Sequence, residues 1–462
     1  MRSTTKPSPP LAGALTALSL TMLLPSLSIS IANVGLPTIA VAFNAPFNAV
    51  QWVVIAYLLA ITTLVVGLGR LGDLLGRRRL LLGGITVFTL ATLLCGLAPT
   101  LPLLIAGRAL QGVGAACMMA LAMAFVGETV PKDRTGRVMG LMGTMSAIGT
   151  ALGPSLGGAL IALSGWRSIF LVCVPLGVLA LVLVHRVLPE SAPDGGRFDV
   201  MGTVVLGITL GAYALAVTVD KGSSAVVLLV VATMGVGLFL FVQRRVPSPL
   251  VDLAMFRDPV LTAGLTTSAL VSTVMMATLV VGPFHLVGAL GLNPALAGLA
   301  MSVGPVVSAL TGVPAGRAAD RFGRATMVVV GLSGVIAGSA VLAVMPAAAG
   351  VAGYVLPLVV ITASYAVFQA ANNTAVMSTV PARLRGVVSG TLHLSRNLGL
   401  MTGASVMGAV FAFAVGTGEV VTAGAAEVAR GTRWTFGVAA VLVACGLAVA
   451  VGLLRRSELP VS

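Results

Sequence analysis

Charged side chains, and acidic ones above all, are scarce in this chain. Of its 462 residues 58% are hydrophobic and only 9% are charged, with 13 Asp and Glu against 27 Lys and Arg. A soluble domain carries roughly 25% charged residues, because its surface has to stay in contact with water. The shortage of charge therefore excludes a soluble enzyme fold.

Cysteine is also rare, and its positions give no sign of a metal site. The four cysteines fall inside apolar runs and have no ligand spacing; they are Cys95, Cys117, Cys173 and Cys445. We interpret them as small core residues. Since no nucleophile and base pair and no phosphate-binding loop stands out either, the sequence predicts neither an enzyme nor a bound cofactor or metal.

Long apolar runs are what the sequence does have. A helix needs about 20 residues to cross the hydrocarbon of a bilayer, and fourteen runs approach or reach that length. They cover residues 11–36, 49–69, 80–98, 102–126, 138–163, 168–184, 201–219, 225–242, 260–286, 294–315, 326–345, 352–376, 387–414 and 432–454. The first run, which follows Arg2 and Lys6, is too long for a cleaved signal peptide. The sequence thus predicts an all-α membrane protein with fourteen transmembrane helices.

The basic residues indicate the orientation. If the N-terminus is cytoplasmic, most of the 27 Lys and Arg residues fall in cytoplasmic loops, and only Arg167, Lys221, Arg430 and Arg433 lie outside. Cytoplasmic loops carry the excess of Lys and Arg in membrane proteins, so we expect both termini in the cytoplasm. The net charge of +14 is then an orientation signal that also suits anionic lipid, and no nucleic-acid partner is expected.

A nine-residue motif occurs twice, once in each half of the chain. Gly69, Asp73, Gly76 and Arg77 of the first copy match Gly316, Asp320, Gly323 and Arg324 of the second. Later anchors keep the same order, since Gly136 matches Gly386 and Phe170 matches Phe436. The pattern indicates a duplicated unit of six spans with two extra spans between the copies. We expect an N-terminal six-helix bundle over residues 1–190, two linker helices over 191–256 and a C-terminal bundle over 257–462.

Three motifs resemble those of the major facilitator superfamily, and the extra pair of spans is similar to its fourteen-helix drug:proton antiporter branch. The loop between helices 2 and 3 carries Gly69, Asp73, Gly76, Arg77 and Arg78. Helix 4 carries Arg108 and Gln111. Helix 5 carries Gly149, Gly153, Pro154, Gly157 and Gly158, the pattern of exporters in the family. The resemblance implies a secondary transporter that works by alternating access.

Two of these motifs suggest moving parts. Asp73 and its copy Asp320 lie beside arginines, so each either latches the two halves in one state or belongs to a plain solvated loop; the duplication favours the latch. The helix-5 glycines lie on one helix face, where another backbone can approach, and Pro154 permits a bend. This face is either a packing seam or a gating hinge, and the resemblance favours the hinge.

Polar residues inside the spans are the candidates for substrate or proton contact. A charge within a bilayer is costly, so Arg108 and Arg396 should face a partner or a wet cavity, unless they snorkel to the interface. In helix 12 a polar stripe of Tyr365, Gln369 and Asn372 either bonds neighbouring helices or contacts substrate. The full set of candidates is Ser28, Asn33, Tyr57, Arg108, Gln111, Tyr365, Gln369, Asn372, His393 and Arg396.

One position departs from the family pattern. Ser28 stands where this branch usually carries an acid in helix 1, and the sequence places no carboxylate at mid-membrane. Proton coupling would then have to use His393, Glu128, Asp73 or a proton carried by the substrate. Because neither buried arginine has an anionic partner, the cavity should prefer anionic or neutral amphiphiles to cationic ones.

The sequence as a whole predicts a monomeric secondary transporter of a bacterial inner membrane. We expect it to export small amphiphilic compounds, similar to drugs or antibiotics, against proton entry driven by the proton gradient. Two alternatives stay open at this point. One is an importer or facilitator for a nutrient, which the helix-5 motif argues against, and the other is a ligand-sensing membrane protein that does not transport.

Overall fold

The computed structural model describes residues 11–129, 135–189, 198–218, 223–246, 249–250, 253–379, 385–416, 420 and 423–457. Every regular element within these residues is helical. Fourteen helices are long and apolar enough to cross a membrane, which confirms the predicted fold class. A helix satisfies its own backbone hydrogen bonds, as a chain crossing hydrocarbon must.

The first six spans form one bundle. Its elements are α1 (Leu11–Phe43), α2 (Phe47–Val50), α3 (Trp52–Leu75), α4 (Arg77–Leu97), α5 (Leu101–Thr129), α6 (Thr135–Ser164), α7 (Ser168–Leu171) and α8 (Cys173–Val187). α1 packs along α6, while α5 packs against both α3 and α4. The short helices α2 and α7 begin the second and sixth spans.

The last six spans form the second bundle. Its elements are η1 (Leu253–Arg257), α11 (Pro259–Phe284), η2 (His285–Ala289), α12 (Pro294–Phe322), α13 (Arg324–Val344), η3 (Ala347–Ala349), α14 (Gly350–Thr379), α15 (Arg385–Thr402), η5 (Gly403–Met407), α16 (Gly408–Val415) and α17 (Ala425–Ser457). Two of its spans contain a π-helical turn, η2 after α11 and η5 between α15 and α16. Such turns interrupt the regular α-helical ladder and are frequent at functional sites.

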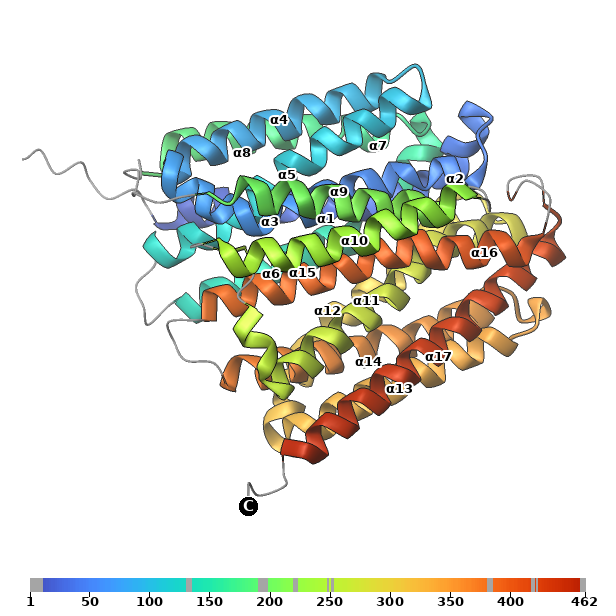
Figure 1. Ribbon diagram of the computed structural model, residues 1–462. Helices are drawn as coiled ribbons and strands as arrows, with labels where there is room; N and C mark the ends of the chain where they lie inside the picture. The colour runs from blue at the N-terminus through green and yellow to red at the C-terminus, as the bar shows by residue number, and fades with distance from the viewer. Residues whose placement is uncertain are drawn as a thin grey trace, which may run out of the picture.

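The two extra spans, α9 (Val200–Thr218) and α10 (Ser223–Arg245), lie side by side along the seam between the bundles (Figure 1). α9 packs on α3 of the first bundle and on η5 of the second. The indole nitrogen of Trp52 donates to Thr218 Oγ1 at 3.1 Å, which ties α9 to α3. α10 packs on α9 and only 11% of its span is buried, so most of its surface faces lipid.

Asp199 is a buried carboxylate at the start of α9. Only 6% of its surface is exposed. Its Oδ1 accepts from the Gly202 backbone N–H at 2.7 Å, and its Oδ2 accepts from Gln243 Nε2 at 2.7 Å. The carboxylate therefore caps α9 and joins α9 to α10, and these bonds offset its removal from water.

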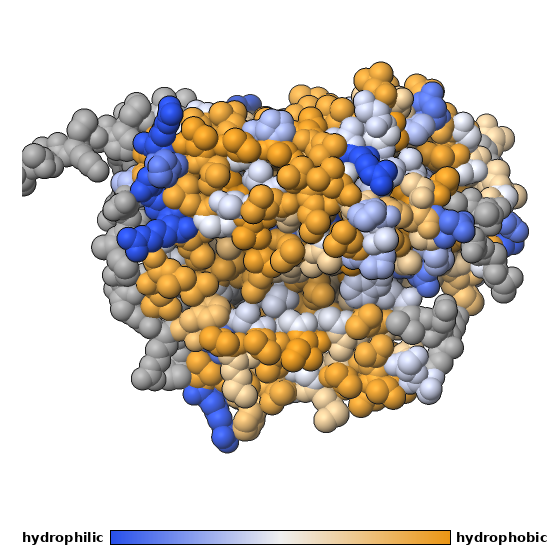
Figure 2. Space-filling view, turned by 90° about the horizontal axis from the view of Figure 1, so that it is seen from above, coloured by the Kyte–Doolittle hydropathy of each residue, from blue (hydrophilic) through white to orange (hydrophobic). Residues whose placement is uncertain are grey.

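The molecule has two polar ends and an apolar belt between them. α1 begins and α17 ends at the same end (Figure 1). Figure 2 shows hydrophobic side chains over the middle of the molecule and hydrophilic ones toward both ends. We call the end where α1 begins the basic end, because Arg77, Arg78, Arg244, Arg245 and Arg324 lie there at helix termini. The opposite end, where α2 lies, is the far end.

Both copies of the repeated motif make the same turn at the basic end. α3 and α4 meet at Gly76, and α12 and α13 meet at Gly323. Both glycines have a φ of 89°. Residues with a Cβ rarely adopt this left-handed region, so glycine is needed at each turn. The shared geometry supports the duplication inferred from the sequence.

The final helix begins earlier than its apolar run. α17 starts at Ala425, whereas the run starts at residue 432. Glu427 in the first turn accepts from the Gly424 N–H at 2.9 Å, and Arg430 donates to the Ala414 and Val415 carbonyls at 2.9 and 2.8 Å. Polar residues therefore form and stabilise the first turns of α17, which precede the apolar run. Hydropathy alone does not mark where the helix begins.

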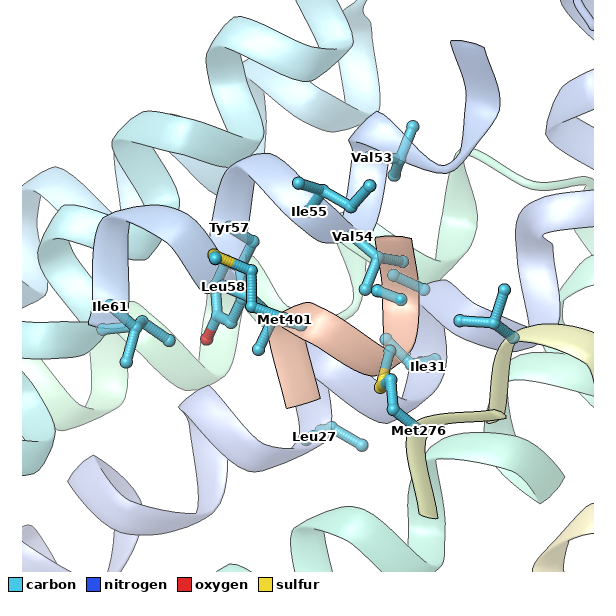
Figure 3. Packing of buried hydrophobic residues seen from close by; sticks show 14 of the residues in the cluster. Leu27, Ile31, Val53, Val54, Ile55, Tyr57, Leu58, Ile61, Met276 and Met401 are labelled. Atoms are coloured by element: carbon cyan, nitrogen blue, oxygen red, sulfur yellow. The ribbon is translucent and has the colours of Figure 1, made fainter. Parts of the chain in front are cut away.

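A continuous apolar core joins the two bundles. Figure 3 shows Leu27 and Ile31 of α1 together with Leu58 of α3, packed with Met276 and Met401 of the second bundle. All five side chains are buried. The seam between the bundles is therefore closely packed in this region.

Candidate transport site

A cavity of about 260 Å³ lies between the two bundles, midway along the helices. The first bundle lines it from α1, α3, α5 and α6, and the second from α11, α12, α14 and α15. Ligand pockets for drug-sized compounds usually measure about 300–1,000 Å³. This cavity is slightly smaller, so in this conformation it suits a small compound.

Methionine forms much of the apolar wall. Met119 comes from α5, Met275 and Met276 from α11, and Met301 from α12. Methionine side chains are flexible and polarisable, so they adapt to ligands of different shape. The wall is therefore suited to amphiphiles that share an apolar body without sharing one structure.

A pair of hydroxyls connects α1 and α6 at the cavity. Ser26 Oγ and Ser146 Oγ are 2.6 Å apart, and both residues line the space. Ser26 also lies 3.2 Å from the Met22 carbonyl oxygen, to which it donates. The pair gives the first bundle a neutral polar edge that can exchange hydrogen bonds with a ligand.

Arg396 is the only charged residue among the described lining residues. Its Nε is buried and has no hydrogen-bond partner among the described atoms, and the same holds for the amide nitrogen of its neighbour Asn397. Buried donors without a partner are costly, because they lose their hydrogen bonds to water. The second bundle thus presents a cation and an amide to the cavity.

The polar stripe of α14 lies partly at the cavity and partly against a neighbouring helix. Tyr365 lines the cavity, and its hydroxyl accepts from Gln369 Nε2 at 3.2 Å. Asn372 is buried and donates to the Gly264 carbonyl on α11 at 3.1 Å. One end of the stripe therefore reaches the cavity, while the other end bonds a neighbouring helix.

Arg108 lies wholly inside the first bundle and neither lines the cavity nor snorkels to an interface. It is 0% exposed. Its Nε donates to the Val53 carbonyl at 2.8 Å and its Nη1 to Ser28 Oγ at 3.1 Å and to Gln111 Oε1. The guanidinium carbon is 4.1 Å from the centre of the Tyr57 ring. Arg108 thus binds α1, α3 and α5 together through neutral partners.

The other first-bundle candidates belong to the same buried region. Ser28, Tyr57 and Gln111 all contact Arg108. Gln111 extends the hydrogen-bond network to α4, because its Nε2 donates to Thr92 Oγ1 at 2.7 Å. Asn33 is buried as well and donates to the Ile29 carbonyl at 3.0 Å. In this conformation Ser28, Tyr57 and Gln111 join helices of the bundle, and Asn33, like them, stands apart from the cavity.

Of the ten candidates, the structure places Tyr365 and Arg396 in the cavity lining. Gln369 is not among the lining residues, although it donates to Tyr365, which is. His393 lies one turn before Arg396 on α15, is partly buried and makes no hydrogen bond with a described residue. Asn397 and the methionines were not among the candidates. The methionines gave no signal of their own, because methionine inside a span also fits an ordinary core. Their position inside the spans was the signal that could have found them.

The far end of the cavity is closed by contacts between the bundles. Phe47 of α2 lies with its ring centre 4.8 Å from that of Phe284 of α11 and 5.4 Å from that of Phe411 of α16. Just beyond α2, Gln51 Nε2 donates to the Ala404 carbonyl of η5 at 2.9 Å. These contacts join the two bundles and separate the cavity from the far end.

Tyr354 forms part of the wall toward the far end. Its hydroxyl donates to the Thr278 carbonyl at 3.3 Å, and its ring stacks on His285 with the centres 5.4 Å apart. Tyr354 lines both the central cavity and a second pocket of about 20 Å³ beside His285. That pocket has room for about one water molecule. A single aromatic ring thus separates the two spaces.

The helix-5 motif lies on α6 and packs closely against two helices, α1 and α12. A Cβ on Gly149 would lie 2.5 Å from the Leu23 carbonyl oxygen of α1, and a Cβ on Gly153 would overlap Ser30. Toward the far end, a Cβ on Gly158 would lie 2.5 Å from the Pro294 carbonyl oxygen of α12. Gly157 meets Ile31 of α1, and Pro154 approaches Gly298 of α12. The motif is a packing face, and a hinge role for it stays a prediction.

The loop motif is only partly visible. The side chains of Asp73 and Glu128 lie outside the described residues. Arg77 donates to the Ala124 carbonyl at 3.4 Å and Arg78 to the His185 carbonyl, so both arginines reach other helices of the first bundle. In the second copy Asp320 is exposed and forms no hydrogen bond or ion pair with the described part of the chain. The latch stays a prediction.

Comparison with known proteins settles the family. The family model described as Major Facilitator Superfamily matches residues 18–404. The chain belongs to the major facilitator superfamily. It is therefore a multi-pass membrane transporter and not an enzyme, as its two six-helix bundles around a central cavity also suggest.

Other members of the superfamily resemble the whole chain. The multidrug efflux pump LfrA of Mycolicibacterium smegmatis is 32% identical over 405 residues, which cover 86% of this chain and 80% of LfrA. The riboflavin transporter RibZ of Clostridioides difficile is 27% identical over 94% of this chain and 95% of its own. A bacterial homologue of the human lysosomal transporter Spinster, solved in an inward-facing conformation, superposes with a TM-score of 0.73. That structure covers 98% of this chain and 99% of its own at 15% identity, so it supports the fold.

Proposed function

We propose that this superfamily member exports small amphiphilic compounds from a bacterial cell by alternating access, coupled to proton entry. The observation that carries the proposal is the central cavity, which is lined by both bundles and closed at the far end. A solute held there changes sides when the bundles rock about it. The efflux-pump relative LfrA and the helix-5 pattern of exporters favour export.

The orientation belongs to the same proposal. The protein would lie in the plasma membrane with both termini in the cytoplasm. The basic end then faces the cytoplasm, as the positive-inside rule requires. The far-end contacts then close the cavity to the outside. The described conformation would be the one that loads substrate from the cytoplasm.

Export is tested with the neutral fluorescent amphiphile N-phenyl-1-naphthylamine in a host that lacks its own exporters. Expression of the protein should lower cellular accumulation of the dye. Gly153→Leu should abolish the effect, because even a Cβ at this position overlaps Ser30. Gly83→Leu is the matched control, since nothing lies within 4 Å of a Cβ there. Equal accumulation with and without the protein would contradict export of this class of compound.

Proton coupling is tested separately in proteoliposomes. An imposed pH gradient should drive net movement of N-phenyl-1-naphthylamine against the proton flow, and nigericin with potassium should abolish it. Counterflow without a gradient measures transport itself. If counterflow persists while the gradient has no effect, antiport is wrong and the protein is a facilitator.

The riboflavin relative supports a second candidate, transport of a heteroaromatic metabolite. RibZ matches 94% of this chain, a larger share than LfrA does. Binding of riboflavin to the purified protein would favour this candidate, provided that N-phenyl-1-naphthylamine fails to compete.

A further inference from the structure

We propose that Arg396 and Asn397 form a subsite that binds the anionic group of the substrate, while the methionine wall holds its apolar body. The inference rests on the proposed transport function and names the class of compound that the cavity takes. Carboxylates and sulfonates belong to this class when they are attached to an apolar ring system.

The first support is the state of the two donors. Arg396 Nε and Asn397 Nδ2 are both buried, and neither has a hydrogen-bond partner among the described residues. By contrast, Ser26 and Ser146 at the cavity pair with each other, and the Tyr365 hydroxyl accepts from Gln369 Nε2. Buried donors left open in a cavity indicate an acceptor that arrives with the ligand or as water.

The second support is the charge of the lining. Arg396 carries the single formal charge among the described lining residues, and no Asp or Glu is among them. A guanidinium in a poorly solvated space gains from an anion beside it, because the anion replaces lost hydration. A cationic ligand in the same space would meet repulsion with no carboxylate to offset it.

The third support is the arrangement of the apolar residues. Met275, Met276 and Leu279 on α11 and Met301 on α12 line the cavity together with the two donors on α15. An amphiphile with one acidic group can place that group at α15 and its rings against α11 and α12. A neutral amphiphile fits the same wall but leaves the donors to water.

Arg108, the other arginine inside the spans, differs in this respect. Three of its donor bonds are made to Val53, Ser28 and Gln111 within the first bundle, and it does not line the cavity. Its role is therefore internal to the bundle. The cavity charge comes from Arg396 alone among the described residues.

A pair of matched dyes tests the subsite. 8-Anilinonaphthalene-1-sulfonate and N-phenyl-1-naphthylamine share the same ring system, and only the former carries a sulfonate. Binding to the protein in lipid nanodiscs is measured by fluorescence after subtraction of empty nanodiscs. Arg396→Gln should weaken binding of the sulfonate at least about tenfold, the usual effect of losing a charge-assisted hydrogen bond, and change binding of the neutral dye less than about twofold.

Three further variants sharpen the result. Arg396→Lys keeps the charge but loses the forked donors, so its sulfonate affinity should lie between wild type and Arg396→Gln. Asn397→Leu, in which the new side chain is of similar size, should weaken binding of the sulfonate dye by about three- to tenfold. Arg433→Gln removes an exposed arginine of the same bundle outside the central cavity and should change neither dye.

Several outcomes would overturn the subsite. The first is an equal loss of affinity for both dyes in Arg396→Gln. The second is no change in affinity for either dye, and the third is that the wild type binds the neutral dye alone. In each case persistent efflux of the neutral dye from cells would leave the transport proposal intact. Loss of that efflux in wild type would instead remove the proposed function itself.

Discussion

At the scale of single residues, the position of Ser28 explains how the first bundle holds a buried arginine without an acid. Its hydroxyl lies 3.1 Å from Arg108 Nη1, and the other partners of the guanidinium are two carbonyls, an amide and two aromatic rings. Arg108 Nη2 still has no partner among the described atoms. The site is thus a fixed cation in a neutral shell.

Removing this cation should destabilise the protein. In Arg108→Gln the Val53 carbonyl and the Ser28 hydroxyl lose their donor, and hydrogen bonds to charged groups contribute about 1.5–3 kcal/mol each. We expect the free energy of unfolding to fall by at least about 2 kcal/mol, measured by denaturant titration in detergent. Arg186→Gln, at an exposed position near the end of α8, should change it by less than about 0.5 kcal/mol.

An added acid should be tolerated at one serine and not at another. In Ser28→Asp the new carboxylate lies beside Arg108 and pairs with it, so we expect the melting temperature in detergent to be kept or raised. Ser30→Asp is the matched variant on the same helix, at a position where the hydroxyl donates to the Gly149 carbonyl at 3.2 Å. A carboxylate there faces carbonyl oxygens and should lower the melting temperature. Equal effects of the two changes would contradict this account of Ser28.

At the scale of elements, the contact of α6 with α12 joins the bundles at the far end. Gly158 and Gly298 allow these helices to approach so closely that a Cβ on Gly298 would overlap the Pro154 carbonyl. Small residues permit such approach between membrane helices, where dispersion between backbones replaces the hydrophobic effect. The closed far end depends on this contact and on the cluster of Phe47, Phe284 and Phe411.

Adding one methyl group at this contact should open the far end. In Gly298→Ala the new Cβ displaces α6, which weakens the closed conformation relative to one that is open at the far end. Spin labels on α6 and α12 near the far end should report a longer distance by pulsed electron resonance. Gly312→Ala on the same helix has no atom within 4 Å of its Cβ and should leave the distance unchanged. A distance unaltered in both variants would show that the contact does not hold the closed state.

The elements were largely predictable from the sequence, and the site was predictable only in part. Apolar runs mark the spans because only apolar helices are stable in the bilayer interior. They miss the first turns of α17, which come before the run. Tyr365 and Arg396 stand out as polar residues inside spans, and both line the cavity. Met275 and Met276 do not stand out, since a cavity wall and a core have the same composition. Helical spacing also placed Arg108 and Gln111 on one face without telling which helix that face meets.

At the scale of the whole molecule, two bundles meet around one cavity, and α9 lies across the seam. α9 contacts α3 of the first bundle and η5 of the second, while α10 behind it faces mostly lipid. A helix that touches both bundles moves relative to at least one of them when they rock. The hydrogen bond of Trp52 to Thr218 ties α9 to the first bundle, and the bond between Asp199 and Gln243 ties α9 to α10.

The topology is open to direct labelling. Thr100, in the exposed turn between α4 and α5, lies at the far end, whereas Pro189, which is exposed just after α8, lies at the basic end. With the termini in the cytoplasm, a membrane-impermeant maleimide added to intact cells should label Thr100→Cys and leave Pro189→Cys unlabelled until the cells are opened. The unmodified chain is the control, because three of its four cysteines are buried and Cys445 lies within the α17 span. The reverse pattern would place the termini outside.

In the proposed cycle, the single formal charge among the described lining residues would also make transport sensitive to voltage. A substrate-free carrier would move the Arg396 charge across part of the membrane field, whereas a monoanion bound beside Arg396 would cancel that charge during the loaded step. A full elementary charge gains about 2.3 kcal/mol for each 100 mV of membrane potential. In a cell that is negative inside, the field would therefore pull the substrate-free carrier back toward the cytoplasm after each release. The resting potential would speed the return step and leave the loaded step nearly untouched.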